Sequence, residues 1–213
     1  MNHKKLCIFD LDGTMVNSLA DLAAAVNHGL SAMGYPEHPT DAYRMMVGNG
    51  ARILCKRALP EGVSDSEIDR LHSLFSEYYN AHSLEYTLPY EGICALLDKL
   101  LDAGCILAAA TNKPQVFAEQ IIHHFFGDRF SVIRGGCGKP APDAVLDILS
   151  VTSCSAEQAV LLGDSNVDIF TAKHACIDAI ACCWGFRSEQ ELREAGAEVL
   201  IHTPADAVKI LCG

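Results

Sequence analysis

The sequence is short of positive charge. Its 213 residues include 16 Lys and Arg against 27 Asp and Glu, which gives a net charge of −11 at pH 7. A surface of this sign repels phosphate backbones and anionic lipids, so nucleic acid and membrane are disfavoured as partners. An anionic substrate would therefore need local cations: a metal ion, a lysine, or backbone N–H groups at a helix start.

Long apolar runs are also lacking. Only Leu6–Phe9 separates the first lysines from Asp10, too little for a signal peptide, and no later stretch is long and uncharged enough to span a bilayer. The ten cysteines include no Cys-x-x-Cys pair, and several lie in apolar runs. We therefore expect a cytoplasmic protein with reduced thiols and no disulfide framework.

The apolar residues that are present, half of the chain, are distributed in short runs. These runs cover residues 6–10, 106–110, 131–134, 160–163, 179–183 and 198–201. Helical patterns lie between most of them; one example is the stripe of apolar residues from Ile93 to Leu101 that ends at Gly104. Such alternation predicts an α/β protein with a doubly wound, mainly parallel sheet and a Rossmann-like core.

One region, from about residue 17 to 88, interrupts this alternation. It contains no convincing strand and two long helical patterns, the second opened by a capping box of Ser64 and Glu67. We predict a helical cap domain at 17–88, inserted into a catalytic core made of 1–16 and 89–213. Since the insert starts just after the first strand, it can lie over that strand's end as a lid.

The most informative motif is the pair Asp10 and Asp12, directly after the first apolar run and before Gly13. Residues two apart in a strand point the same way. Two carboxylates this close repel each other unless a cation or a shared proton offsets their charge. The motif therefore predicts a divalent metal, a shared proton, or both.

Polar clusters stand at the ends of three further runs or just before helices. They are Thr111 with Asn112, Lys139, and Asp164 with Asp168. In a parallel sheet such ends meet at one edge. Oxygen-only ligands suit a hard cation such as Mg²⁺, and the lysine and helix N-termini suit a phosphoryl group. One carboxylate would attack phosphorus, and the other would move a proton to the leaving oxygen and from the attacking water.

These four motifs together resemble those of the haloacid dehalogenase-like hydrolase superfamily, over nearly the whole chain. The insert is similar to the cap of its phosphatases. The segments Val47–Ala51, Thr111–Pro114, Gly163–Asn166 and Trp184–Phe186 resemble the phosphoglycolate phosphatase branch.

The resemblance implies a role for each residue. Asp10 would be the nucleophile and a Mg²⁺ ligand, and Asp12 the general acid/base with its backbone carbonyl on the metal. Lys139 would neutralise nucleophile and phosphate. The other implied roles are phosphate binding by Thr111 and Asn112, a metal ligand at Asp164, and support of the metal or of Lys139 by Asp168.

The resemblance favours a Mg²⁺-dependent phosphatase for a small phosphorylated metabolite such as 2-phosphoglycolate. A phosphotransferase such as a sugar-phosphate mutase, or an inorganic pyrophosphatase, remains an alternative. A dehalogenase would leave Asp12 without a task, and a non-catalytic protein is disfavoured because the acidic residues and Lys139 are all present. In the cap, Arg52 is the candidate for a substrate carboxylate, although a solvated helix face explains it equally well.

Overall fold

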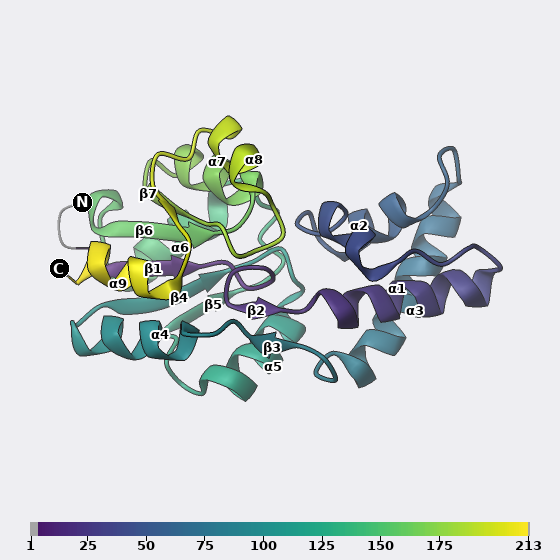
Figure 1. The fold of residues 1–213 in the computed structure, drawn as a ribbon, viewed down its shortest axis with the longest axis horizontal. Coiled ribbons are helices and arrows are strands. Elements are labelled where there is room, and N and C mark those ends of the chain that lie inside the picture. The colour runs from purple at the N-terminus through teal and green to yellow at the C-terminus, as the bar shows by residue number, and fades with distance from the viewer. Residues whose placement is uncertain (1–3, 213) are drawn as a thin grey trace.

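The computed structural model describes residues 4–212 (Figure 1). Within this range, six parallel strands form one sheet in the order β5-β4-β1-β6-β7-β8. The strands are β1 (Leu6–Phe9), β4 (Ile106–Ala110), β5 (Val132–Arg134), β6 (Ala159–Gly163), β7 (Asp178–Cys182) and β8 (Leu200–Ile201). The strand order reverses beside β1, and open α/β sheets bind ligands at such a reversal. The predicted doubly wound parallel sheet is confirmed.

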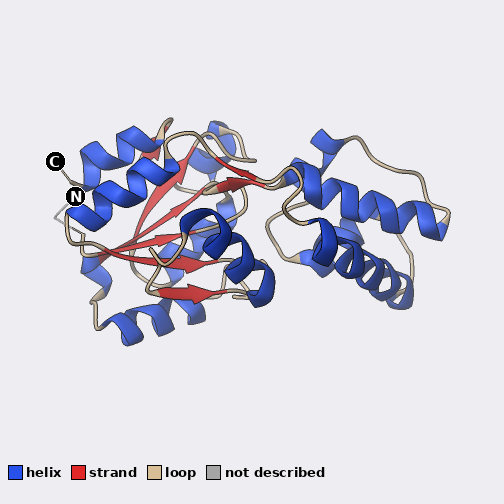
Figure 2. Ribbon diagram, turned by 90° about the horizontal axis from the view of Figure 1, so that it is seen from below, coloured by secondary structure: helices blue, strands red, loops and turns tan. Residues whose placement is uncertain are grey.

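Helices cover both faces of this sheet (Figure 2). One face packs on α4 (Ile93–Asp102), α5 (Gln115–Phe126) and α9 (Pro204–Leu211), and the other on α6 (Asp143–Thr152) and α7 (Asn166–His174). The short elements η2 (Ala156–Gln158) and α8 (Glu189–Glu194) complete the core. Successive residues of β1 alternate between the two apolar clusters. This burial on both sides is why the strand reads as a continuous apolar run.

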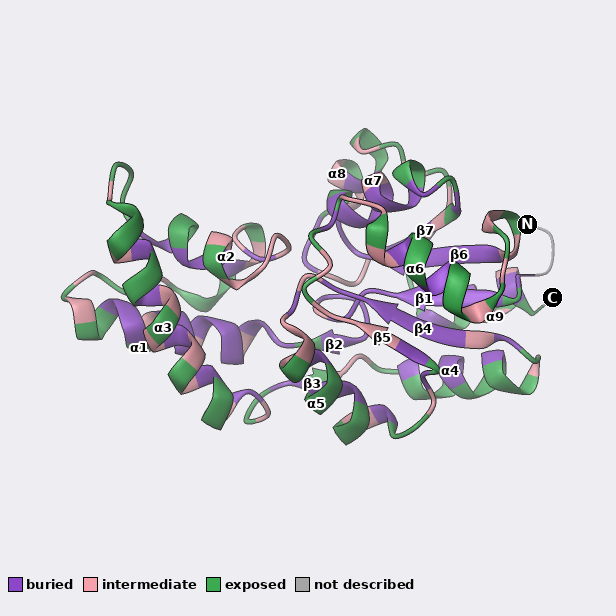
Figure 3. Cartoon of the chain, turned by 180° about the vertical axis from the view of Figure 1, so that it is seen from behind, coloured by how far each residue is buried: buried purple, intermediate pink, exposed green. Residues whose placement is uncertain are grey.

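A separate group of helices stands beyond the carboxyl ends of the strands (Figure 1). It consists of α1 (Leu19–Met33), η1 (Thr40–Met45), α2 (Ala51–Ala58) and α3 (Asp65–His82), which share their own apolar cluster. Figure 3 shows α1 mostly buried, and α3 buried along one side and exposed along the other. The predicted capping box of Ser64 and Glu67 opens α3. The domain boundaries at 17–88 stay a prediction.

Two very short strands join this helical group to the core. β2 (Val16–Asn17) pairs antiparallel with β3 (Leu88–Pro89). No strand was expected between residues 17 and 88, because two residues are too few for a strand's alternation to show. Beside this pair, the buried carboxylate of Asp21 accepts hydrogen bonds from the backbone N–H groups of Tyr86 and Thr87 and from the Thr87 hydroxyl. The two connecting segments are thereby held together.

No helix formed by residues 4–212 is both long and apolar enough to cross a membrane.

Candidate active site

Three buried carboxylates meet at the carboxyl edge of the sheet. Asp10 follows β1, Asp164 follows β6, and Asp168 lies in the first turn of α7. One carboxylate oxygen from each lies within 4.8 Å of the others. The structure thus brings together three of the predicted metal ligands from the ends of two neighbouring strands, β1 and β6.

Lys139 supplies a positive charge to this group. Its Nζ atom lies 3.0 Å from Asp10 Oδ1 and 2.5 Å from Asp168 Oδ1, and the residue is only 4% exposed. Burial by itself would lower the pKa of Lys139, but the carboxylates of Asp10 and Asp168 raise it above its usual value. The lysine therefore stays charged and pairs with two of the three acids.

One lysine does not offset three carboxylates. Burial and the neighbouring Asp168 raise the pKa of Asp10 to about 6 and that of Asp164 to about 8. Both shifts report a surplus of buried negative charge, which a cation would relieve. The donor atoms are all oxygens, the set that Mg²⁺ prefers. The residues present therefore fit a hard divalent cation.

The backbone packs so closely around Asp164 that two neighbouring positions have no space for a side chain and are glycine. A Cβ atom on Gly13 would lie 2.3 Å from Asp164 Oδ2, and one on Gly185 would lie 2.2 Å from Asp164 Cβ. Gly13 also has φ of +89°, a conformation that side-chain-bearing residues rarely adopt. Asp164 is held further by hydrogen bonds from the Thr14 hydroxyl at 3.1 Å and the Phe186 N–H at 2.7 Å.

Asp168 and Asp10 differ in how many of their oxygens are engaged. Asp168 Oδ1 accepts from Lys139, and its Oδ2 accepts from the hydroxyl and the N–H of Ser165. Asp10 Oδ1 accepts from the Leu11 N–H at 2.7 Å and faces Lys139, whereas no donor among residues 4–212 bonds to Asp10 Oδ2. Asp10 thus keeps one carboxylate oxygen that can bond to a substrate, and Asp168 is placed to hold Lys139.

Asp12 lies apart from the three acids and has its own lysine. Its carboxylate accepts from the Ser18 hydroxyl and from Lys113 Nζ at 3.0 and 3.1 Å. Lys113 is buried and lies 4.7 Å from the centre of the Tyr79 ring. Burial would lower the pKa of Lys113, but Asp12 raises it above its usual value. The sequence alone indicates no role for Lys113, because only its side-chain contacts with Asp12 and with Tyr79 of the cap distinguish it from other lysines.

Thr111 and Asn112 follow β4 but differ in their surroundings. Thr111 is buried and lines the cavity described below. The Asn112 amide donates to the carbonyls of Gly48 at 2.9 Å and Lys139 at 3.0 Å, and its oxygen accepts from the Lys139 N–H at 2.7 Å. Asn112 therefore fixes the backbone of Lys139 and joins it to the cap. Its predicted role as a phosphate ligand stays a prediction.

A cavity of about 40 Å³ lies between the core and the helical group. Its polar lining comes from the core and includes Asp10, Asp12, Thr111, Asn112 and Lys113, and its apolar lining from the cap includes Leu22, Val47, Leu54 and Phe75. Because a single water needs about 10–15 Å³ on this measure, the cavity has space for a few waters.

Arg52 is not brought to this cavity. It lies on α2, where its guanidinium forms ion pairs with Asp69 at 2.7 Å and Asp65 at 2.9 Å on α3. It is absent from the residues that line the cavity within the described range. The assignment of Arg52 to a substrate carboxylate stays a prediction.

The loop after β7 connects the acids to the cap. Besides the Phe186 N–H on Asp164, the Phe186 ring joins the apolar cluster of the cap. The buried Arg187 donates to the carbonyls of Arg44 and of Val47, the latter at 2.7 Å. In the sequence, Trp184–Phe186 is recognisable only as a resemblance, and no pattern there indicates these contacts.

The fold is a parallel sheet that carries acids and a lysine at its carboxyl edge, beneath a helical cap. This arrangement defines a class of hydrolases, and similarity to known proteins agrees with it. Residues 7–182 match the family described as Haloacid dehalogenase-like hydrolase. The chain therefore belongs to the haloacid dehalogenase-like hydrolase family.

Within this family the relatives point to one branch. The chain is 37% identical over 204 residues to the phosphoglycolate phosphatase of Psychrobacter arcticus, covering 90% of this chain and 88% of that protein. The solved structure of a predicted phosphoglycolate phosphatase from Haemophilus somnus is 29% identical with a TM-score of 0.91, covering 99% of both chains. A second solved structure, from Lactobacillus delbrueckii subsp. bulgaricus, has a TM-score of 0.94 and is 29% identical to this chain, and the match covers 98% of both chains. The predicted resemblance to the phosphoglycolate phosphatase branch is confirmed.

Proposed function

We propose that this enzyme is a Mg²⁺-dependent phosphatase that hydrolyses a small phosphomonoester, with 2-phosphoglycolate as the first candidate. One observation carries the proposal. Asp10 belongs to the acidic cluster that Lys139 joins, and it lines a small cavity together with Asp12. One of its carboxylate oxygens accepts no hydrogen bond from any described residue. The relatives named as phosphoglycolate phosphatases support the choice of substrate.

Asp10 and Asp164 would hold the Mg²⁺ ion through their carboxylates and Asp12 through its backbone carbonyl, while Asp168 would support the site by holding Lys139. When bound, the ion supplies positive charge that offsets the repulsion between the Asp10 carboxylate and a phosphate group. Lys139 adds a fixed charge on the same side of Asp10. Thr111 lies beside Asp10 in the cavity and can donate its hydroxyl to a phosphate oxygen.

The reaction proceeds in two halves. Asp10 Oδ2 attacks phosphorus, the bond from phosphorus to the ester oxygen breaks, and Asp12 gives its proton to the departing alcohol. A water molecule then attacks the aspartyl-phosphate, Asp12 takes its proton, and Asp10 and inorganic phosphate are released. Ser18 and Lys113 hold the Asp12 side chain in position for both transfers.

The small cavity favours a small substrate. A volume of about 40 Å³ beneath an apolar cap suits a phosphate with a short carbon chain better than a nucleotide or a polymer end. Closure of the cap would also exclude water that competes with the intended chemistry.

The test is phosphate release from a panel of 2-phosphoglycolate, hexose phosphates, nucleotides and pyrophosphate, with Mg²⁺ and with excess EDTA. We expect the highest kcat/KM on 2-phosphoglycolate and loss of activity in EDTA that Mg²⁺ restores. Transfer of phosphate between positions of a sugar, or cleavage of pyrophosphate alone, would replace the proposal with a mutase or a pyrophosphatase. An Asp10→Asn preparation purified in parallel excludes a contaminating phosphatase.

Replacing Lys113 with methionine is expected to lower kcat on an alkyl phosphate by about 10–100-fold, a part of what acid–base catalysis contributes. The reason is that Asp12 loses the ion pair that positions it. The loss in kcat/KM, which reports the first half-reaction alone, should be smaller on an aryl phosphate whose phenolate leaves without a proton. Kinetics on both esters measure this, with Lys99→Met on the exposed side of α4 as the control. Equal losses in kcat/KM on both esters would contradict a role through Asp12.

A further inference from the structure

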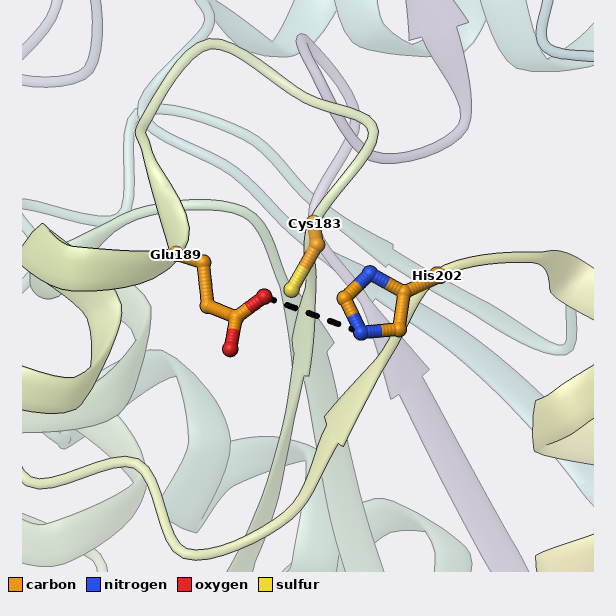
Figure 4. A group of neighbouring side chains, drawn as sticks. All are labelled: Cys183, Glu189 and His202. Atoms are coloured by element: carbon orange, nitrogen blue, oxygen red, sulfur yellow. Dashed lines mark ion pairs between the residues drawn. The ribbon is translucent and has the colours of Figure 1, made fainter.

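A second cluster of metal-ligating side chains lies away from the acidic cluster, around the start of α8. It consists of Cys183, Glu189 and His202 (Figure 4). One ligand atom from each lies within 4.8 Å of the others. Glu189 Oε2 and His202 Nε2 are 3.7 Å apart.

Two of the three positions are fixed by the sheet. β7 and β8 are parallel, with Cys182 beside Ile201, so the next step in register places Cys183 beside His202. The Cys183 N–H donates to the Ile201 carbonyl at 2.9 Å, which continues the pairing through this step. Side chains at paired positions of neighbouring strands share a face. The sulfur and the imidazole therefore start from a rigid backbone arrangement.

The third position is fixed by the start of a helix. Glu189 is the first residue of α8, whose capping box is formed by Ser188 and Glu191. Glu189 Oε1 accepts two hydrogen bonds from Arg193, at 2.9 and 2.7 Å. This leaves Oε2 on the side of His202, as Figure 4 shows.

The combination of sulfur, nitrogen and oxygen donors points away from Mg²⁺. Thiolate and imidazole ligands select Zn²⁺ and similar borderline or soft cations. Two ligands about 2.0–2.1 Å from a tetrahedral zinc lie about 3.4 Å from each other. The separation of 3.7 Å between Glu189 and His202 is close to this, and the exposed imidazole can rotate to reach it.

We propose that Cys183, Glu189 and His202 bind a thiophilic divalent cation such as Zn²⁺, with a fourth position open to water. Binding forms a sulfur–metal bond, and the thiol proton of Cys183 passes to solvent. The cation would close the base of the loop between Cys183 and Glu189, the same loop that holds Asp164 and the cap through Phe186 and Arg187.

Co²⁺ serves as a probe, because a cobalt–thiolate bond gives a charge-transfer absorption band that oxygen ligands do not give. The full chain is titrated with Co²⁺ in excess Mg²⁺, so that the acidic cluster is already occupied. We expect the band to appear at one equivalent and to vanish when Zn²⁺ is added. Zn²⁺ should also raise the melting temperature, since only the folded chain brings the three ligands together.

Matched variants locate the site. The band should be lost in Cys183→Ser, weaken by at least about tenfold in apparent affinity in His202→Gln, and persist in Cys94→Ser, which alters an exposed thiol on α4. His202 is exposed, so His202→Gln tests the proposal even if Cys183→Ser folds poorly. Absence of the band in the unsubstituted chain, its persistence in Cys183→Ser, or an unchanged apparent affinity in His202→Gln would overturn the proposal and leave Glu189 and His202 as an ordinary ion pair.

Discussion

Phosphate release by Asp10→Asn is expected to fall by at least about 10⁴-fold in kcat, the scale on which loss of a nucleophile acts. The substitution keeps the shape of the side chain and its contact with the Leu11 N–H, but an amide cannot displace the ester oxygen. Steady-state kinetics with 2-phosphoglycolate and with an aryl phosphate measure the loss. It should be the same on both substrates, because attack on phosphorus is needed for each.

Asp12→Asn is the matched control, because it removes the neighbouring carboxylate of the same motif. Its loss should be smaller on the aryl phosphate in the first half-reaction, where no proton is needed, and aspartyl-phosphate should accumulate because the second half still needs a base. Rapid quenching and mass measurement of the protein detect that intermediate. An active Asp10→Asn enzyme would remove Asp10 from the mechanism.

The sheet could be predicted because its strands are buried on both faces. Each of the predicted apolar runs contains or overlaps a strand of the six-stranded sheet, and the pattern is clearest in β1, β4 and β6, which are buried along nearly their whole length. The two-residue strands β2 and β3 could not be predicted, because their pairing depends on how the chain leaves and re-enters the core.

The clustering at the sheet edge was also predictable in part. Asp10, Thr111 and Asp164 follow parallel strands whose ends must converge, and Asp10, Asp164 and Lys139 do meet. The separation of Asp12 from the acids was not predictable, because it depends on the side-chain contacts with Ser18 and Lys113. The pairing of Arg52 with Asp65 and Asp69 likewise depends on how α2 packs on α3.

The site's chemistry follows from an imbalance of charge that no single motif reveals. Burial and the neighbouring Asp168 raise the pKa values of Asp10 and Asp164, and the one lysine of the cluster pairs with only two of its three acids, so the cluster can take a further cation. Lys139 is thus the only positive charge that residues 4–212 place in ion pairs with these three acids. Its removal should lower activity and stability but increase the stabilisation that Mg²⁺ gives.

Replacing Lys139 with methionine is expected to lower kcat by about 10²–10³-fold, the effect of losing one preorganised electrostatic partner. Without Mg²⁺ the free energy of unfolding should fall by about 3–5 kcal/mol, because Asp10 and Asp168 lose their buried partner. Kinetics and denaturant unfolding measure the two effects, with Lys173→Met, exposed on α7, as the control.

Mg²⁺ separates the electrostatic role of Lys139 from a merely structural one. The Lys139→Met cluster carries one more uncompensated negative charge, so Mg²⁺ should stabilise the variant against unfolding more than it stabilises the unsubstituted enzyme. Activity should nevertheless stay low, since the ion does not replace the ammonium group that faces Asp10 and Asp168. If added Mg²⁺ restored full activity, Lys139 would serve only to hold the acids together; if it stabilised both proteins equally, Lys139 would not set the charge of the cluster.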